Sequence, residues 1–296
     1  MKTNSQIKII ANEKSKLPLH GWIGFSLVFL FWILNWVLTG PRTQWGFFPL
    51  WLGYCLAIDG LVYWRMRTSL LTRSLGRYIG LFIVSAPVWW LFELLNVRTQ
   101  NWLYLGAELF TPLQYFLLTT LSFTTVIPAV FGSAEFFASF DFIKRLKPGF
   151  KIGTDKRTTA SFFALGWIML ALLYLYPKTF FPFIWLSPYF ILEPINVWLG
   201  NRSLANWTAK GDWRPVIALW CGVLLTAFFW EMWNYYSYPK WIYNVYWGNW
   251  FHLFEMPLLG YGGYLPFALE LYALYHLAAG WFGDKESDYI NITRRD

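Results

Sequence analysis

Two acidic residues of this chain lie where a membrane helix would not ordinarily carry a charge. Glu93 is followed three residues later by Asn96, and Glu231 is followed three residues later by Asn234, each pair near the end of a long apolar run. Residues three apart share one face of a helix, so each pair presents a carboxyl group beside an amide. Ionisable residues within membrane spans usually face the bundle interior or a cavity. Two interpretations stay open: a neutral Glu that acts as a general acid, or a Glu and an Asn that link helices.

The segment after Asn234 is rich in Trp and Tyr and also contains His252 and Glu255. Trp and Tyr favour the membrane–water boundary, because their rings are apolar while their N–H and O–H groups need water. An interfacial belt is therefore one interpretation, and an aromatic lid over a lipophilic substrate, with Glu231 beneath it, is the other. On the second interpretation the catalytic candidates are Glu231, Glu255 and Glu270. The substrate would contact Trp230, Trp233, Asn234, Trp241, Tyr243 and His252, together with Glu93 and Asn96 of the first pair.

Glu270 closes a stretch, residues 257–270, that contains two Pro and three Gly. Pro and Gly at membrane depth weaken the helical hydrogen-bond ladder, which is tolerated where neighbouring protein or a cavity satisfies the backbone. This composition indicates either a functional pocket around Glu270 or a kinked helix whose glycines permit close packing.

The elements that must position these residues are long apolar helices. The chain is 57% hydrophobic and only 14% charged, whereas soluble domains carry roughly a quarter charged residues. Apolar runs of about 18 residues or more can cross the bilayer as helices. The sequence therefore predicts an all-α, polytopic membrane bundle of about eight spans. They lie near 21–39, 46–64, 78–97, 109–139, 159–176, 181–199, 215–236 and 257–281.

Most of the 24 Lys and Arg residues lie in the tails and in every second loop. Because basic residues of short loops stay on the cytoplasmic side, we expect both termini in the cytoplasm and a location in a plasma membrane of the bacterial inner-membrane type. This bias accounts for the net charge of +8, since basic loops also suit anionic lipid headgroups. A nucleic-acid partner is therefore not expected.

The two halves of the chain align with each other. Residues 48–64 match 182–198 at a constant offset of 134, and the two acidic pairs match at an offset of 138. We therefore expect two parallel four-span repeats, 21–139 and 159–281, within one membrane domain. A basic cytoplasmic linker at 140–158 joins them, a basic cytoplasmic tail precedes them at 1–20, and a cytoplasmic tail follows them at 282–296. Asp59 and Glu193 would then lie at matching depths near the cytoplasmic face. The alternative is that aromatic-rich membrane sequences align through composition alone.

No cofactor is expected. His252 and His276 would lie on opposite sides of the membrane, roughly 36 Å apart at 1.5 Å per helical residue, too far to share a haem. His20 and His276 share the predicted cytoplasmic side but lie at interfaces. The chain also lacks HxxxH, HExxH and paired CxxC spacings, which indicates that no metal is bound.

The stretches Asn101–Gly106 and Leu265–Glu270, on a background of tandem multi-span repeats, resemble the membrane-bound lycopene cyclases and related carotenoid-modifying families. Those families place their acid as Pro-x-Glu followed by another acid, whereas here the spacing is Pro-x-x-x-Glu without a second acid, which puts the role of Glu270 in doubt. The resemblance implies catalysis without a cofactor, in which Glu231 or Glu270 protonates an isoprenoid double bond and aromatic faces stabilise the carbocation.

The competing hypothesis is a membrane protein without enzymatic activity. It would be either a transporter with its site between the halves or a structural subunit of a membrane complex. The expected partners are accordingly membrane lipids or a lipophilic small molecule and, for the structural role, another membrane protein. Glu93 and Glu231 are expected near the outer face of the membrane. A polar path from them to Asp59 and Glu193 would favour transport, whereas acids that pair only locally would favour a structural role.

Overall fold

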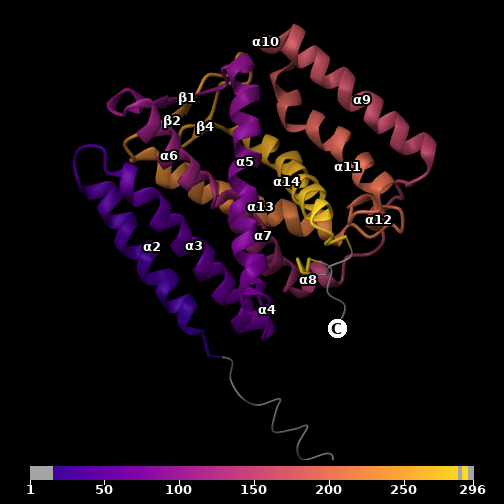
Figure 1. The fold of residues 1–296 in the computed structure, drawn as a ribbon, viewed down its shortest axis with the longest axis horizontal. Coiled ribbons are helices and arrows are strands. Elements are labelled where there is room, and N and C mark those ends of the chain that lie inside the picture. The colour runs from indigo at the N-terminus through magenta and orange to yellow at the C-terminus, as the bar shows by residue number, and fades with distance from the viewer. Residues whose placement is uncertain (1–15, 286–288, 293–296) are drawn as a thin grey trace, which may run out of the picture.

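The computed structural model describes residues 16–285 and 289–292, and these are mostly helical (Figure 1). Seven helical stretches among them are long and apolar enough to cross a membrane. The chain is therefore a multi-pass membrane protein. The seven are α2 (Leu19–Val37), α3 (Thr43–Met66), α5 (Leu75–Thr99), α6 with α7 (Pro112–Phe123 and Val126–Ala138), α9 (Lys156–Leu175), α10 to α11 (Pro177–Phe180 to Ser187–Leu199) and α13 (Arg214–Tyr235).

Two of the predicted spans are interrupted. The span predicted over 109–139 breaks at Thr124 and Thr125 into α6 and α7, and the one over 181–199 contains a short 3₁₀ turn, Phe181–Trp185, before α11. The eighth predicted span corresponds to α14 (Tyr261–Trp281), a helix of 21 residues that is not among the seven. The prediction of an all-α membrane bundle with several apolar helices is thus confirmed. The number of eight spans stays a prediction.

The structure also contains two small antiparallel strand pairs, which were not predicted from the sequence. The first pair joins β1 (Trp102–Leu105), which follows α5, to β2 (Lys240–Tyr243), which follows α13. In its register Trp102 faces Tyr243, and Tyr104 faces Trp241. The second pair, β3 (His252–Leu253) with β4 (Met256–Pro257), is a hairpin within the segment before α14. The β1–β2 pair therefore ties two segments far apart in the chain together above the helices.

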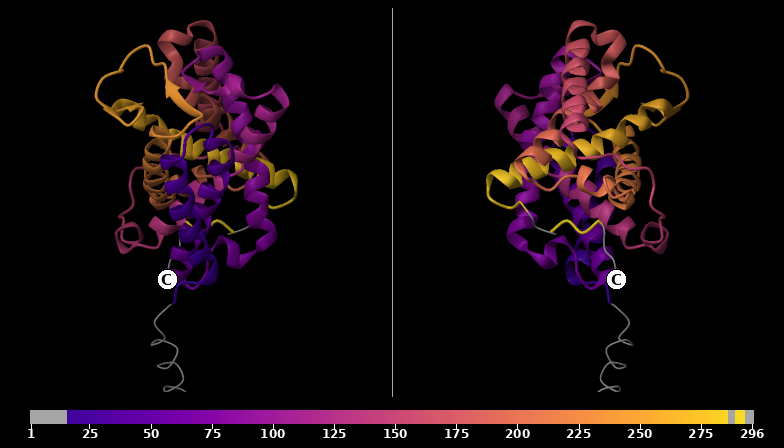
Figure 2. Two further views of the ribbon diagram at one scale, coloured as in Figure 1. Left: turned by 90° about the vertical axis from the view of Figure 1, so that its left-hand side faces the viewer. Right: turned by 90° about the vertical axis from the view of Figure 1, so that its right-hand side faces the viewer.

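The helices form one intertwined body (Figures 1 and 2). Helices α2 and α3 lie along one side, α9 and α11 along the other, and α5, α7, α13 and α14 fill the centre. Helix α7 packs closely on α13, where a Cβ added at Gly222 would lie 2.7 Å from the Cα of Ala134. A glycine at this contact lets the two backbones approach, as is common between membrane helices.

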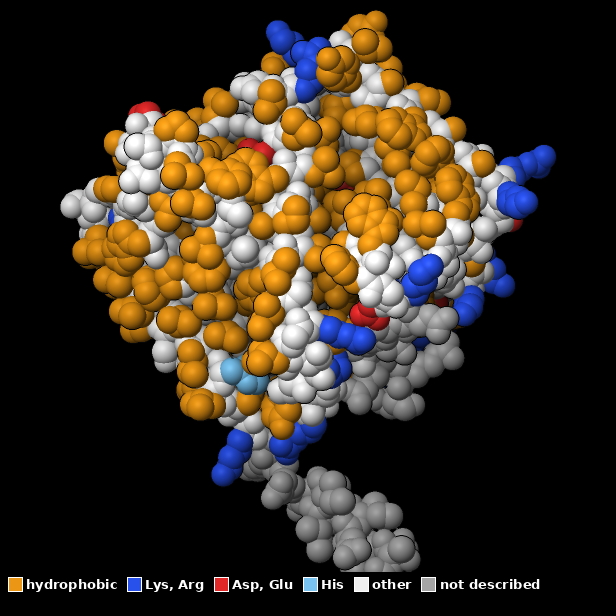
Figure 3. Space-filling view, viewed as in Figure 1, with side chains coloured by type: hydrophobic (Ala, Val, Ile, Leu, Met, Phe, Trp, Pro, Cys, Tyr) orange, Lys and Arg blue, Asp and Glu red, His pale blue; other side chains and the backbone are white. Residues whose placement is uncertain are grey.

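The two ends of the molecule differ. The strands β1 and β2 and helix α10 lie at the upper end in Figure 1, whereas the short helices α4 (Leu70–Arg73) and α8 (Asp141–Lys144) lie at the lower end. Figure 3 shows hydrophobic side chains over most of the visible face and basic side chains mainly at its lower, right-hand and upper margins. The tail predicted at 1–20 lies largely outside the described residues, so the cytoplasmic placement of both termini stays a prediction.

Two buried acids support short helices. The Oδ1 atom of Asp59 accepts a hydrogen bond of 3.0 Å from the backbone N–H of Leu71 in α4. The Oε1 atom of Glu193 accepts one of 2.6 Å from the backbone N–H of Ala205 at the start of α12 (Ala205–Thr208). Carboxyl groups are favourable partners for the unpaired N–H groups at a helix start. Both acids thus have a local structural role.

Candidate functional site

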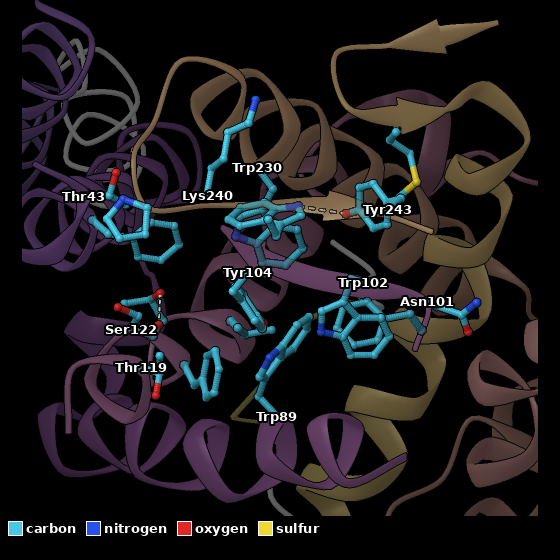
Figure 4. Close-up of a pocket in the computed structure, with 18 of the residues that line it drawn as sticks. Thr43, Trp89, Asn101, Trp102, Tyr104, Thr119, Ser122, Trp230, Lys240 and Tyr243 are labelled. Atoms are coloured by element: carbon cyan, nitrogen blue, oxygen red, sulfur yellow. Dashed lines mark hydrogen bonds between the residues drawn. The ribbon is translucent and has the colours of Figure 1, made fainter. Parts of the chain in front are cut away.

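A cavity of about 220 Å³ lies below the β1–β2 pair, between α3, α5, α6, α13 and α14 (Figure 4). Aromatic side chains dominate its wall. Figure 4 shows Trp89, Trp102, Tyr104, Trp230 and Tyr243 gathered around it, with Thr43, Ser122 and Thr119 to one side. Pockets that take small molecules are mostly apolar with a few polar groups, and this cavity fits that description. The aromatic part of the wall comprises Phe47, Trp89, Trp102, Tyr104, Phe110, Tyr115, Phe123, Phe181, Trp185, Trp230, Trp241, Tyr243, Tyr264 and Phe267.

Glu231 lies directly behind this wall and is fully buried in α13. Its Oε1 atom accepts hydrogen bonds of 2.6 Å from the hydroxyl groups of both Tyr243 and Tyr264, and these two tyrosines line the cavity. The Oε2 atom of Glu231 is buried and has no hydrogen-bond partner among the described residues. The carboxyl group is thus separated from the cavity by two phenols. We refer to Glu231, Tyr243, Tyr264 and Trp241 as the Glu231 cluster.

Glu93 occupies the corresponding place behind another part of the wall, near the end of α5. Its Oε1 atom accepts hydrogen bonds from the indole N–H groups of Trp89 (2.9 Å) and Trp102 (3.0 Å) and from the hydroxyl of Tyr104 (2.5 Å). These three donors also line the cavity. We refer to these four residues as the Glu93 cluster. Both acids, Glu231 fully buried and Glu93 half-buried, therefore hold aromatic side chains of the cavity wall in place.

The hydrogen bonds determine which surface the aromatic side chains offer to a ligand. Five wall residues direct their polar N–H or O–H groups away from the cavity, toward the two carboxyl groups. What faces the cavity is then mainly the flat ring surface, which carries partial negative charge and attracts cations. Desolvation, followed by the charge of the neighbouring Glu, raises the pKa of Tyr104 and of Tyr243 well above the usual value. These two phenols in β1 and β2 therefore stay protonated and keep donating to the acids.

The two Asn residues of the predicted pairs fix the strands. Asn96 donates to the carbonyl of Trp102 (2.9 Å) and accepts from the backbone N–H groups of Asn101 (2.8 Å) and Trp102 (3.3 Å). Asn234 likewise donates to the carbonyl of Trp241 (2.7 Å) and accepts from its N–H (2.9 Å). Because both ends of each amide are engaged by backbone, these contacts favour the structural interpretation of Asn96 and Asn234 over direct contact with a substrate.

The remaining candidates are dispersed. Glu255 pairs with Lys240 beside the cavity, and His252 is exposed and lies 3.0 Å from the side chain of Asn249. Glu270 is fully buried in α14, and neither it nor Trp233 is among the residues that line the cavity. Trp230, Trp241 and Tyr243 do line it. The structure thus brings Glu231 together with Trp230, Trp241 and Tyr243, but not with His252 or Glu270.

Sequence reasoning missed Tyr264, Trp89, Trp102 and Tyr104 as part of the site. Tyr264 lies in the Gly-rich stretch that drew attention only for its backbone, although a Tyr between glycines at membrane depth could have been recognised as a hydrogen-bond donor to a buried acid. Trp102 and Tyr104 lie within the segment Asn101–Gly106, which carried the resemblance described above but was not assigned to the site.

No group of three or more His, Cys, Asp or Glu side chains within the described ranges could hold a metal ion. Comparisons with protein-family models, with curated proteins and with solved structures give no match for this chain. The resemblance to lycopene cyclases accordingly stays a prediction, and the function has to be argued from the geometry of the cavity.

Proposed function

We propose that this membrane protein binds a lipophilic, unsaturated small molecule, isoprenoid-like in character, in the aromatic cavity and isomerises or cyclises it by acid catalysis. The observation that carries the proposal is the orientation of the wall. Aromatic side chains that line the cavity turn their polar groups toward the carboxyl groups of Glu93 and Glu231 and leave ring faces for the ligand. Such a surface suits an apolar ligand and would also stabilise a carbocation formed from it.

The proposed acid is Glu231, acting through a phenol. Glu231 does not line the cavity, whereas Tyr243 and Tyr264 do and contact its carboxyl group. In the proposed step a phenol rotates, accepts the proton of the neutral carboxyl group and passes its own proton to a carbon of the double bond. The carbocation then loses a proton from an adjacent carbon to the phenol, and the phenol passes a proton back to the carboxylate of Glu231. The substrate and product are isomers, so no oxidant, reductant or cofactor is consumed.

The predicted duplication of the chain supports a cavity shared by two halves. In the strand register Trp102 pairs with Tyr243, and Tyr104 pairs with Trp241. If Trp102 is exchanged with Trp241 and Tyr104 with Tyr243, the same two pairs result, so the register is symmetric. The acids that support α4 and α12, Asp59 and Glu193, contact backbone N–H groups that are likewise 134 residues apart, those of Leu71 and Ala205. These matches are what two repeats related by a two-fold axis would produce, with the cavity close to that axis.

Transport is the second candidate, because hydroxyl groups lie buried between the cavity and Asp59. The hydroxyl of Tyr54 lies 2.7 Å from that of Ser133, which also accepts from Thr226 at 3.1 Å. Thr226 precedes Trp230 by one helical turn, and Tyr54 precedes Asp59 on α3. A substrate that crosses the membrane would need such polar groups along its path. The hydroxyl cluster is the feature that a transport assay should address.

Replacement of Glu231 by Gln tests the proposed catalysis. An amide cannot supply the acid proton, so E231Q should lose the reaction by at least about 100-fold, the usual contribution of a general acid. Lipid extracts of cells that express wild type, E231Q or E108Q would be profiled by liquid chromatography and mass spectrometry. Glu108 is exposed and outside the cavity wall, so E108Q serves as the matched control.

The expected result is a product of unchanged mass but altered retention that wild type and E108Q form and E231Q does not. Protein levels in the membrane are compared in the same cells, since E231Q could also lower expression. Identical profiles for all three variants at equal protein levels would contradict the catalytic proposal. If the profiles stay identical while replacement of Ser133 by Ala abolishes uptake of a lipophilic compound, transport is favoured instead.

A further inference from the structure

The segment between β2 and α14, residues 244–260, forms one wall of the cavity. Val245, Met256 and Gly260 are among the lining residues. The segment includes the β3–β4 hairpin and stands out from the helical body in Figure 2, where it is the long orange to yellow loop. Any ligand that leaves or reaches the cavity on this side must pass this segment, which we call the outer loop.

The outward surface of the outer loop is mainly apolar, with Asn249 and His252 as its exposed polar residues near the tip. Phe251 is 78% exposed and Trp250 is 62% exposed, and both lie at the tip beside the hairpin. Leu253, Leu258 and Leu259 are exposed as well. The loop contains no Lys or Arg, and its one acidic residue, Glu255, is paired with Lys240. An exposed surface of this composition is typical of protein that dips into a membrane interface.

The apolar surface of the outer loop is continuous with a membrane-facing helix. The ring of Phe254 lies 5.7 Å from that of Phe228, an exposed residue of the spanning helix α13. Phe254 also lies 5.9 Å from the ring of Tyr235, at the end of the same helix. Lipid that surrounds α13 therefore meets the outer loop without an intervening polar surface.

Contacts with the body of the protein hold the first part of the outer loop, where the rings of Tyr246 and Trp247 lie 6.4 and 4.9 Å from that of Phe181 and the ammonium group of Lys178 lies over the ring of Tyr246. Asn244 N–H donates to the carbonyl of Asn101 (2.7 Å) at one end, and Trp247 Nε1 donates to the carbonyl of Thr179 (3.3 Å). Across the middle, Lys240 of β2 forms an ion pair with Glu255 and also donates to the carbonyl of Tyr235 (3.1 Å). Both members of the ion pair are mostly shielded from solvent, so their attraction is screened less than that of a surface pair.

We propose that the outer loop lies in the outer interface of the bilayer and acts as a lateral gate through which a lipophilic substrate passes from the lipid into the cavity. The Lys240–Glu255 ion pair is the latch that holds the gate closed. The partner of this surface is the lipid leaflet itself, because the apolar tip continues the lipid-facing surface of α13. This inference rests on the proposed function in one respect, namely that the cavity takes a ligand from the membrane.

The position of the loop is tested with a fluorophore in reconstituted vesicles. Cys55 and Cys221 are first replaced by Ala, and a single Cys at Phe251, Ile83 or Lys151 is labelled with an environment-sensitive dye. Ile83 is an exposed residue within the spanning helix α5, and Lys151 is exposed in the linker between the halves. Phosphatidylcholine carrying a spin-label quencher either just below the headgroup or deep in the chain is then added.

The expected result is that the dye at Phe251 is quenched several-fold more by the shallow label than by the deep one, with the reverse order at Ile83. The dye at Lys151 should respond to neither. If the dye at Phe251 is quenched no more than that at Lys151, the loop does not lie in the lipid and the inference is wrong, whatever the cavity binds.

The latch is tested by the rate at which a fluorescent polyene fatty acid, parinaric acid, reaches the cavity from vesicles, measured by energy transfer from Trp. K240M and E255Q should each accelerate uptake several-fold, and the charge exchange K240E/E255K should restore the wild-type rate. R98M is the control, since Arg98 contacts Tyr174 at the same end and does not touch the outer loop. Uptake at an unchanged rate in both single variants overturns the gate. Absence of uptake by wild type at equilibrium contradicts the proposed function, and the gate with it.

Discussion

The Glu93 and Glu231 clusters both hold aromatic side chains of the cavity wall in place, but with different hydrogen-bond donors. In both, an acid near the end of a long helix holds aromatic residues of the cavity wall, and a Tyr of the following strand is one of the donors. Glu93 is held by three donors, two of them indoles, whereas Glu231 is held by two phenols and retains a buried oxygen without a partner among the described residues. A carboxyl group whose partners can both give and accept protons is better suited to proton transfer.

The difference arises at two positions outside the shared pattern. Trp89 contacts Glu93, but the residue at the matching offset of 138 is Ala227. Conversely, Tyr264 contacts Glu231, but the matching residue is Val126. The first cluster thus contains an additional indole, which cannot accept a proton, and the second contains an additional phenol, which can. This contrast is why the proposal assigns structure to Glu93 and chemistry to Glu231.

The largest expected effect concerns the part that the two clusters share, the Asn that fixes each strand. Replacement of Asn234 by Ala leaves a backbone N–H and a carbonyl of Trp241 without their partner. An unsatisfied buried group costs about 1–3 kcal/mol, so the free energy of unfolding should fall by about 2–5 kcal/mol. N96A should cost at least as much, because Asn96 accepts an additional N–H from Asn101. Unfolding by dodecyl sulfate in mixed micelles measures both.

A matched control for these variants is N244A. Asn244 also contacts backbone, but through one long hydrogen bond of 3.4 Å to the carbonyl of Gln100 in an exposed position. Its loss should change the free energy of unfolding by less than about 1 kcal/mol. If N96A and N234A are no more destabilising than N244A, then the two Asn residues do not fix the strands, and a direct role with a ligand becomes the better explanation for both.

The sequence predicted the general architecture because long apolar runs reflect a strong physical requirement, the satisfaction of backbone groups in lipid. It also located both acids at the ends of helices. The strands could not be predicted from the sequence. The four residues of β1 and of β2 show no alternation of apolar and polar side chains that would distinguish them from an interfacial aromatic belt, and the two strands come from segments far apart in the chain. The break between α6 and α7 falls at Thr124 and Thr125, just before Pro128. Pro128 has no N–H to donate to the carbonyl of Thr124, and its ring would clash with that carbonyl, so this proline was a signal for the break that the sequence analysis did not use.

The composition of the site could be predicted only in part. Glu231, Trp230, Trp241 and Tyr243 lie close together along the chain, so local sequence brought them into one hypothesis. Tyr264 comes from another helix, and its distance from Glu231 depends on how α14 crosses α13. His252 and Glu255 were included because they are near in sequence, but the turn of the outer loop takes His252 to the surface and Glu255 to Lys240.

A smaller effect distinguishes the two strand tryptophans. Trp102 donates its indole N–H to Glu93, whereas Trp241 donates its own to the hydroxyl of Tyr243 at 2.9 Å. A hydrogen bond to a charged group contributes about 1.5–3 kcal/mol and one between neutral groups about 0.5–1.5 kcal/mol. A double-mutant cycle of W102F with E93Q should therefore give a coupling energy of about 2 kcal/mol if Glu93 is ionised. The cycle of W241F with Y243F should give about 1 kcal/mol, measured in the same unfolding assay.

The coupling energies also bear on the proposed roles. A coupling for Trp102 and Glu93 as small as that for Trp241 and Tyr243 would mean that Glu93 is neutral in the folded protein. The first cluster could then supply a proton as readily as the second, and the assignment of chemistry to Glu231 alone would lose its basis. The cycles isolate these pairs because the loss of ring area on changing Trp to Phe cancels between the two branches of each cycle.

The smallest expected effect is a pH dependence that the two clusters share through Tyr104 and Tyr243. Both phenols have a pKa raised by desolvation and by the neighbouring Glu, so the folded protein keeps these protons where the unfolded chain, with a pKa near 10, loses them. Stability from each phenol is therefore fully present below about pH 10 and falls above it, by up to about 1.4 kcal/mol per pH unit. Y104F and Y243F should each flatten this alkaline decline by the same amount. The measurement is the free energy of unfolding between about pH 9 and pH 11. If its slope against pH differs between Y104F and Y243F, only one of the two phenols is held protonated by its acid. The two clusters would then differ in their shared donor as well.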